Sequence, residues 1–202
     1  MRIWAVVPVK RLADAKSRLA SVLTIRQRRE LVCLLLSRTL RVLRAFRGRN
    51  GILVVGSDRA VRTIARRYGA EFVAEARRGG MNRALSRARS AAVARRADAV
   101  LVVPADLPLL SARDIAWLKK KTGRPPFVAI APDASGRGTN LLYVSPPGLI
   151  RFSFGANSFR RHLQSAQHSG ITATVLRRRT LARDLDRPED LASVCDLERR
   201  KK

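Results

Sequence analysis

The chain has 202 residues, enough for one α/β domain with a substantial core and too few for two comfortable ones. Its 42 Lys and Arg against 15 Asp and Glu give a net charge of +27, which attracts nucleic acid, membrane phosphates or anionic metabolites. No apolar run is long enough to span a membrane, and the N-terminus does not resemble a signal peptide. The two cysteines, Cys33 and Cys195, predict neither a disulfide framework nor a zinc site, so we expect a cytoplasmic protein.

The first half of the chain alternates apolar strands with amphipathic helices. The predicted strands cover residues 3–9, 52–55, 71–74 and 99–103, and the predicted helices cover residues 24–47, 61–68 and 83–96. This alternation is typical of a doubly wound, mostly parallel α/β sheet. No repeat or linker interrupts the chain, so we expect a single domain over residues 1–202, with a short basic tail from about residue 197 to residue 202.

The second half departs from this alternation. Strands at 127–131 and 140–145, joined by a turn-rich loop, predict a hairpin-like insert. Ser158 opens a predicted helix over 159–169, whose N-terminus would turn free N–H groups and a hydroxyl toward an anion. Val175 is expected in a short strand.

Acidic residues are scarce, so those at predicted strand ends are informative. Asp106 directly follows the apolar strand that ends before Pro104, and Ser111 caps the next predicted helix, 112–121. Asp184 and Asp186 form a second acidic site. Carboxylates at the carboxyl ends of strands, where ligands collect in open α/β sheets, are suited to holding Mg²⁺ on a phosphate. The alternative is that Asp106 and Asp184 only cap turns or helices.

Asp190 is better explained as a first-turn residue that complements a helix dipole than as a metal ligand.

A cationic loop follows the first predicted strand and contains Lys10, Arg11, Lys16 and Arg18. It forms a natural phosphate cradle, although it carries no glycine-rich fingerprint, so side chains must replace backbone contacts. The alternative is ordinary solvated surface charge. Asn82 likewise has two interpretations: a helix cap, or a contact to a nucleobase edge.

Several short blocks, in order along nearly the whole chain, resemble the CofC/FbiD family of guanylyltransferases from deazaflavin coenzyme F420 biosynthesis. The blocks are Val7-Pro-Val-Lys10, Ala15-Lys-Ser-Arg-Leu19, Gly80-Met-Asn82, Pro104-Ala-Asp-Leu-Pro-Leu109, Gly138-Thr-Asn140, Phe154-Gly-Ala-Asn-Ser158 with Arg161-His162, and Asp184-Leu-Asp-Arg-Pro-Glu-Asp-Leu191. The resemblance implies a nucleotide-diphospho-sugar-transferase-like fold of the MobA-like nucleotidyltransferase group.

The resemblance implies an enzyme that transfers GMP from GTP to the phosphate of a phosphorylated three-carbon acid and releases pyrophosphate. Phosphoenolpyruvate is the first candidate acceptor; 2-phospho-L-lactate and 3-phospho-D-glycerate are alternatives. The next enzyme of the deazaflavin pathway would be a partner, and the chain would be a monomer or homodimer.

By position, the resemblance assigns residues to three roles. Thr139, Gly155 and Ser158 resemble the acceptor-phosphate site, and Asp106, Asp184 and Asp186 resemble Mg²⁺ ligands. We further infer that Lys10, Lys16 and Arg18 meet the GTP triphosphate, that Asp106, Lys16 and Arg18 are catalytic, and that Gly80 and Asn82, with Gly79, meet guanine. Arg137, a departure from the family pattern, would add a cation near the acceptor.

Two other functions stay open at this point. One is another MobA-like nucleotidyltransferase, such as a molybdopterin-type guanylyl- or cytidylyltransferase, which the missing glycine-rich first loop disfavours. The other is a basic nucleic-acid binder on a retired transferase fold. Nucleic acid is not expected as the main partner, because the basic residues are spread over nearly every predicted helix and aromatic residues make up only 5% of the chain.

Overall fold

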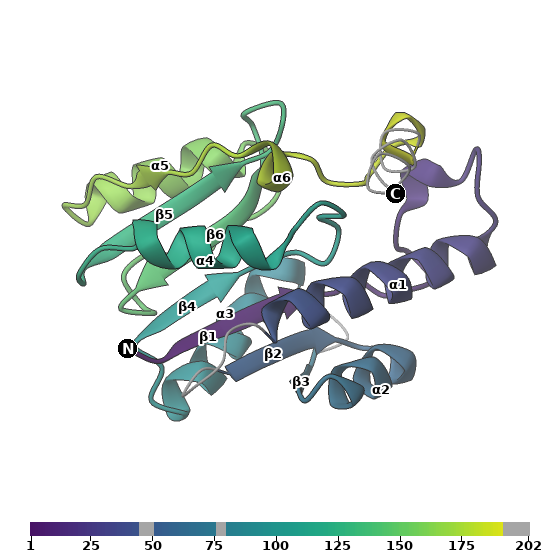
Figure 1. Cartoon of the computed structure of the whole chain (residues 1–202), viewed down its shortest axis with the longest axis horizontal. Coiled ribbons are helices and arrows are strands. Elements are labelled where there is room, and N and C mark those ends of the chain that lie inside the picture. Colours follow the sequence, from purple (N-terminus) through teal and green to yellow (C-terminus); the bar gives the residue numbers. More distant parts are fainter. Residues whose placement is uncertain (45–50, 76–79, 192–202) are drawn as a thin grey trace.

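A mostly parallel sheet organises the chain, with the strand order β3-β2-β1-β4-β6-β5-β7 (Figure 1). The computed structural model describes residues 1–44, 51–75 and 80–191. Within them the strands are β1 (Ile3–Pro8), β2 (Gly51–Gly56), β3 (Glu71–Ala74), β4 (Ala99–Val102), β5 (Phe127–Pro132), β6 (Thr139–Ser145) and β7 (Thr174–Val175). Every described strand pairing is parallel except those that β6 makes with β4 and β5.

Helices cover both faces of the sheet. They are α1 (Ile25–Leu43), α2 (Arg59–Arg67), α3 (Gly80–Ala94), α4 (Ala112–Lys121), α5 (Ser158–His168) and α6 (Arg179–Ala182), with a short 3₁₀ helix, η1 (Ser17–Leu19). Side chains of α1, α2, α4 and α6 pack on one face, and those of α3 and α5 pack on the other (Figure 1). Along β1, Ala5 and Val7 join the first cluster while Val6 joins the second, which is the alternation expected of a strand buried on both faces. The doubly wound α/β prediction is confirmed.

The predicted hairpin forms, but it is not an insert. β5 and β6 pair antiparallel, and β6 lies between β4 and β5, so the pair extends the main sheet. All seven residues of β6 are buried. A strand with both faces buried needs helices on both sides and a neighbour on each edge, which explains why it lies inside the sheet.

Several boundaries differ from the predictions. α1 ends at Leu43, before the predicted end near residue 47, and residues 45–50 lie outside the described part. α3 begins at Gly80, three residues before the predicted start, so Asn82 is a first-turn residue and not the cap. The predicted short strand at Val175 is confirmed. Cys195 and the tail from 197 to 202 lie outside the described residues.

The direction in which the chain adds strands to the sheet reverses between β1 and β4. The chain leaves β1 toward β2, whereas it leaves β4 toward β6 and β5 on the opposite side. Loops that diverge from the carboxyl ends of neighbouring parallel strands leave a crevice between them, and ligands of doubly wound folds bind there. This topology brings the loop after Pro8 close to the loop that carries Asp106.

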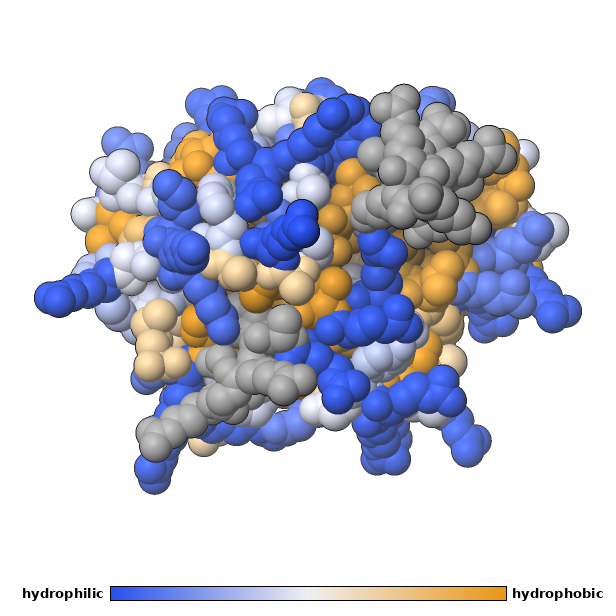
Figure 2. Space-filling view, viewed as in Figure 1, coloured by the Kyte–Doolittle hydropathy of each residue, from blue (hydrophilic) through white to orange (hydrophobic). Residues whose placement is uncertain are grey.

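Hydrophilic side chains project from most of the face shown in Figure 2, with apolar patches between them. None of the helices in the described residues combines the length and apolar character that crossing a bilayer requires.

Candidate active site

Three carboxylates meet at this crevice. One oxygen from each of Asp106, Asp184 and Asp186 lies within 4.8 Å of the others, and each residue is partly buried. Asp106 follows β4, whereas Asp184 and Asp186 follow α6, and the Leu185 N–H donates to the Asp106 carbonyl at 2.9 Å. The structure therefore brings together the two acidic sites that the sequence singled out nearly 80 residues apart.

Asn140 holds the segment that carries Asp184. Its buried amide nitrogen donates to the carbonyls of Leu181 and Ala182, each at 3.1 Å, and lies 3.4 Å from Asp184 Oδ1. Sequence reasoning assigned no role to Asn140, although it stands in the Gly-Thr-Asn block. Asp190 accepts from the N–H groups of Asp186 and Arg187, at 2.9 and 2.7 Å, which confirms its interpretation as a helix-start residue.

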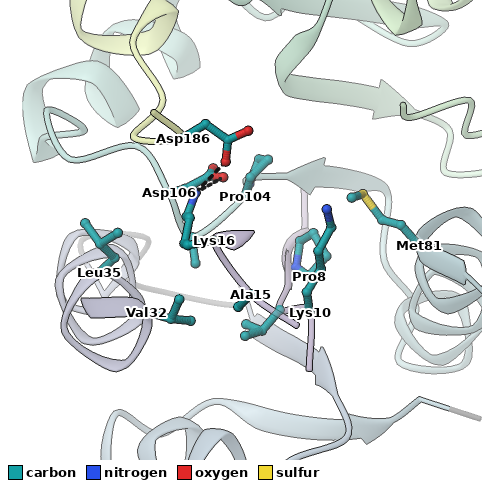
Figure 3. A pocket seen from close by; sticks show the side chains of 12 residues that line it. Pro8, Lys10, Ala15, Lys16, Val32, Leu35, Met81, Pro104, Asp106 and Asp186 are labelled. Carbon is teal, nitrogen blue, oxygen red and sulfur yellow. Dashed lines mark hydrogen bonds and ion pairs between the residues drawn. The ribbon is translucent and has the colours of Figure 1, made fainter. Parts of the chain in front are cut away.

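Lys16 reaches into the acidic cluster (Figure 3). Its ammonium lies 2.8 Å from Asp106 Oδ2 and 3.0 Å from Asp186 Oδ1, and its side chain is only 8% exposed. Arg18 pairs with the other oxygen of Asp186 at 2.9 Å, but its side chain is 66% exposed. Both cations were predicted to lie at the site, and in the structure their described partners are the carboxylates.

The loop that presents Lys16 is fastened at two points. The Leu12 N–H donates to Asp58 Oδ2 at 3.1 Å, and Arg28 Nη1 donates to the Ala15 carbonyl at 3.2 Å. Lys16 itself adopts left-handed backbone angles, with φ of 53° and ψ of 40°, an uncommon conformation for a residue with a Cβ. A constrained backbone at this position aims the ammonium between the carboxylates.

Burial and the charges of neighbouring residues shift the pKa values of Lys16, Asp184 and Asp186. Burial lowers the pKa of Lys16, but Asp106 and Asp186 more than offset this, so the pKa is raised and the ammonium stays charged. Burial, and then the charge of Asp106, raise the pKa of Asp184. Burial also favours the neutral form of Asp186, but Lys16 and Arg18 outweigh it and lower that pKa. Against three carboxylates, the single buried ammonium leaves an excess of negative charge.

These residues fit a divalent cation. Carboxylate oxygens are the ligands that hard cations such as Mg²⁺ prefer, and the partly buried setting strengthens the attraction. Lys16 already supplies one positive charge at the same place, so a metal ion would compete with it for Asp106 and Asp186.

A cavity of about 100 Å³ adjoins the carboxylates (Figure 3). Apolar residues of β1, α1, α3 and the loops that follow β1 and β4 form much of its wall, and Lys10, Lys16, Asp106 and Asp186 supply charge. The apolar or proline side chains are Pro8, Val9, Ala15, Val32, Leu35, Met81, Pro104 and Ala105. Lys10 thus reaches the predicted site, whereas Arg11 is exposed and faces Asp14 at 3.9 Å. Val32, Leu35 and Met81 were not predicted to line the site: Val32 and Leu35 lie within the predicted helix 24–47, and Met81 was noted only as part of the Gly80-Met-Asn82 block.

Asn82 connects α3 to the loop before α5. Its amide nitrogen donates to the Phe154 carbonyl at 3.0 Å, and the Phe154 N–H donates to Asn82 Oδ1 at 2.7 Å. The helix-cap alternative is therefore wrong. A guanine contact by this side chain stays a prediction, but both ends of the amide already bind backbone. Gly80 starts α3 with a positive φ of 65°, and Gly79 lies outside the described residues.

The three predicted acceptor residues lie around the start of α5. Thr139 begins β6, Ser158 begins α5, and Gly155 precedes that helix with φ of +113°, which favours glycine. The expectation of free N–H groups is wrong at two positions, since the Ser158 N–H donates to the Gly155 carbonyl and the Phe159 N–H to the Arg137 carbonyl, each at 3.1 Å. The nearly buried hydroxyls of Thr139 and Ser158 remain as candidate donors.

His162 supports this loop from within α5. It is fully buried; the Ser153 N–H donates to its Nε2 at 3.0 Å, and Thr139 Oγ1 lies 3.0 Å from its Nδ1. Burial, and then the nearby Arg161 charge, lower its pKa to about 4, so the imidazole is neutral at physiological pH. His162 was noted in sequence only as part of the block that contains Arg161-His162, and no role was predicted for it.

The fold is that of nucleotidyltransferases and nucleotide-diphospho-sugar transferases. A proposed nucleotide-diphospho-sugar transferase from Desulfovibrio desulfuricans superposes with a TM-score of 0.74 at 16% identity, over 94% of this chain and 84% of that one. A nucleotidyl transferase from Methanothermobacter superposes with a TM-score of 0.68 at 16% identity, over 99% of each chain. These similarities confirm the predicted fold class.

The chain belongs to the family of guanylyl transferases like CofC, whose model matches residues 2–196. It is 44% identical to the phosphoenolpyruvate guanylyltransferase of Rubrobacter xylanophilus, over 96% of this chain and 94% of the relative. It is 30% identical to the 2-phospho-L-lactate guanylyltransferase of Methanocaldococcus infernus, over 94% and 82%. The predicted family is confirmed, and the protein is a nucleotidyltransferase.

Proposed function

We propose that this enzyme transfers GMP from GTP to the phosphate of phosphoenolpyruvate, releasing pyrophosphate, as a step in coenzyme F420 biosynthesis. The observation that carries the proposal is the cluster of Asp106, Asp184 and Asp186 at the crevice between β1 and β4, in a family whose relatives are named as guanylyltransferases. The acceptor follows the relative at 44% identity; 2-phospho-L-lactate and 3-phospho-D-glycerate remain as alternative acceptors.

The reaction is a single displacement at phosphorus. An oxygen of the acceptor phosphate attacks the α-phosphorus of GTP and forms a new P–O bond. The bond from that phosphorus to the oxygen shared with the β-phosphate breaks, and pyrophosphate leaves with the electron pair. No bond to the protein is needed, so catalysis consists of positioning two anions and offsetting their charge.

The acidic cluster would hold Mg²⁺ through Asp106, Asp184 and Asp186. When bound there, Mg²⁺ supplies positive charge that offsets the negative charge of the phosphates. Lys16, released from Asp106 and Asp186, would be free to meet a phosphate oxygen, and Lys10 and Arg18 lie beside it to neutralise the rest of the triphosphate. The apolar wall formed by Val32, Leu35 and Met81 would limit the access of water.

The acceptor phosphate would lie against the start of α5. The Thr139 and Ser158 hydroxyls are nearly buried and can donate to phosphate oxygens. Gly155 presents backbone without a Cβ in a conformation that other residues rarely adopt. Thr139 also precedes Asn140, which faces Asp184, so the start of β6 connects the acceptor site to the acidic cluster.

The test measures pyrophosphate release from GTP with Mg²⁺, offering each of the three acids separately and ATP, CTP and UTP as controls. Asp106→Asn should abolish turnover, and Asp14→Asn, which alters an exposed acid outside the cluster, should leave it unchanged. A coupled assay with the next deazaflavin-pathway enzyme should run alongside, so that product formation is also recorded as transfer to the deazaflavin acceptor. No turnover with any acid, together with tight salt-sensitive RNA binding, would overturn the proposal.

A further inference from the structure

His162 is hydrogen-bonded on both sides of its ring. In the interior of α5, it accepts the Ser153 N–H at Nε2 and meets Thr139 Oγ1 at Nδ1, each at 3.0 Å. Its exposed fraction is 0%, so water cannot replace either partner. The Phe154 ring packs against the imidazole in a T-shaped arrangement, with centroids 4.9 Å apart. Both nitrogens thus have a fixed environment.

The backbone partner decides which nitrogen carries the proton. A peptide N–H can only donate, so Nε2 must present its lone pair to Ser153. In a neutral imidazole the other nitrogen is then protonated. The Nδ1–H therefore donates to Thr139 Oγ1, and the threonine oxygen accepts this bond.

This assignment fixes the direction of the threonine hydroxyl. Since Thr139 Oγ1 accepts from His162, its own proton is available to donate elsewhere, and no other hydrogen bond to this oxygen occurs among the described residues. With the opposite tautomer the hydroxyl would donate into the ring and have no proton left for a ligand. We infer that His162 is a positioning residue that makes the Thr139 hydroxyl an obligate donor toward an oxygen of the acceptor phosphate; this role rests on the proposed function.

The same loop is fastened from a second side. Ser153 precedes Phe154, whose N–H and carbonyl both bind the Asn82 amide. The backbone that sets the tautomer of His162 is thus itself held by α3. A phosphate oxygen, which only accepts, matches the resulting donor, whereas a group that presents its own donor proton would not.

The tautomer can be measured directly, without any activity. The chain has only two histidines, so ¹⁵N-labelled protein gives two imidazole spin systems in a long-range ¹H–¹⁵N spectrum. His168→Gln, at the exposed C-terminal end of α5, assigns them. We expect His162 to carry its proton on Nδ1 and to stay neutral from pH 8 to pH 5.5. A proton on Nε2, or titration near the ordinary imidazole pKa, would overturn the inference.

Steady-state kinetics test what the tautomer does. Thr139→Val should raise the acceptor KM by about tenfold, the effect of one lost hydrogen bond to a charged group, and leave the KM for GTP unchanged. His162→Gln, which lacks a donor at the δ position, should cause a similar rise. His162→Asn, which keeps an amide N–H there, should cause a smaller one.

The double variant separates positioning from simple support of the fold. If His162 acts through the hydroxyl, His162→Gln should add no further rise in the acceptor KM on top of Thr139→Val. The inference would be overturned if the increases in acceptor KM of the two single variants multiplied in the double variant. It would also be overturned if His162→Gln raised the KM for the acceptor and the KM for GTP equally. If His162→Gln does not fold, the spectrum and a comparison of Thr139→Ser with Thr139→Val still decide it. Absence of guanylyl transfer by the unaltered enzyme would overturn the proposed function and the acceptor role, while the spectrum would still decide the tautomer.

Discussion

Lys16→Met offers a sharp test of the acidic cluster. The methionine fills the space of the lysine stem and removes its charge, which leaves Asp106, Asp184 and Asp186 without their central cation. We expect the metal-free variant to be less stable than the unaltered protein. It should also respond more strongly to Mg²⁺, because the metal no longer competes with an ammonium.

The structure sets the size of this effect. Breaking a fully buried ion pair by removing one partner costs about 3–5 kcal/mol. Here Lys16 is 8% exposed, but Asp106 and Asp186 are 30% and 38% exposed, so water stabilises the carboxylates left behind. We therefore expect a loss of about 2 kcal/mol in the free energy of unfolding. For a chain of this length, that lowers Tm by about 4–8 °C.

The assay is thermal unfolding in EDTA and in saturating Mg²⁺. Arg18→Ala is the matched control: it removes the exposed cation on Asp186 and should lower Tm by less than about 3 °C. The difference in Tm between Lys16→Met and the unaltered protein should shrink when Mg²⁺ is added, since Mg²⁺ binding to the folded state stabilises it. Equal stability of Lys16→Met and the unaltered protein in EDTA, or a deficit that Mg²⁺ leaves unchanged, would refute the reasoning.

The buried His162 and Asn140 and the partly buried Asn82 give three further predictions. The pKa of His162 is about 4 in the folded protein, below the usual imidazole value, so at a pH between these two values the unfolded chain binds more protons than the folded one. The free energy of unfolding should therefore fall by about 2 kcal/mol from pH 8 to pH 5. In His162→Asn, denaturant titrations at several pH values should show a free energy of unfolding that depends less steeply on pH. Asn140→Ala should raise the Mg²⁺ concentration for half-maximal activity about tenfold, and an unchanged requirement would contradict its role in holding Asp184. Asn82→Ala should raise the KM for the acceptor more than that for GTP, because it releases Phe154; a rise confined to GTP would support the guanine contact instead.

The parallel half of the sheet could be predicted because the apolar pattern of its strands in sequence matches their buried positions in the fold. The run from Ala99 to Val103 is apolar throughout, and a strand of this kind has to be central. Asp106 and Asp184 were conspicuous as acids in a basic chain. The place of β6 could not be predicted, because a hairpin pattern fixes which strands pair but not which neighbour lies on the open edge.

The parts of the site that sequence reasoning missed are those defined by contacts between distant residues. His162 looks like any polar residue in a helix until Ser153 and Thr139 are seen on its two nitrogens. The Asn82 amide could have met either a base or the backbone, and the partner 72 residues away becomes visible only in the fold. Hydrogen-bond direction and burial are tertiary properties, so periodicity and motif spacing do not encode them.

The most direct test of the proposed reaction follows an oxygen atom. Phosphoenolpyruvate labelled with ¹⁸O in its phosphate is mixed with GTP, Mg²⁺ and the enzyme, and ³¹P NMR records the products in place. If the acceptor phosphate attacks the α-phosphorus, the GMP phosphorus of the product gains one ¹⁸O in the new P–O–P bridge, and unlabelled pyrophosphate appears. Free GMP without label, or no guanylylated acid, would contradict the account.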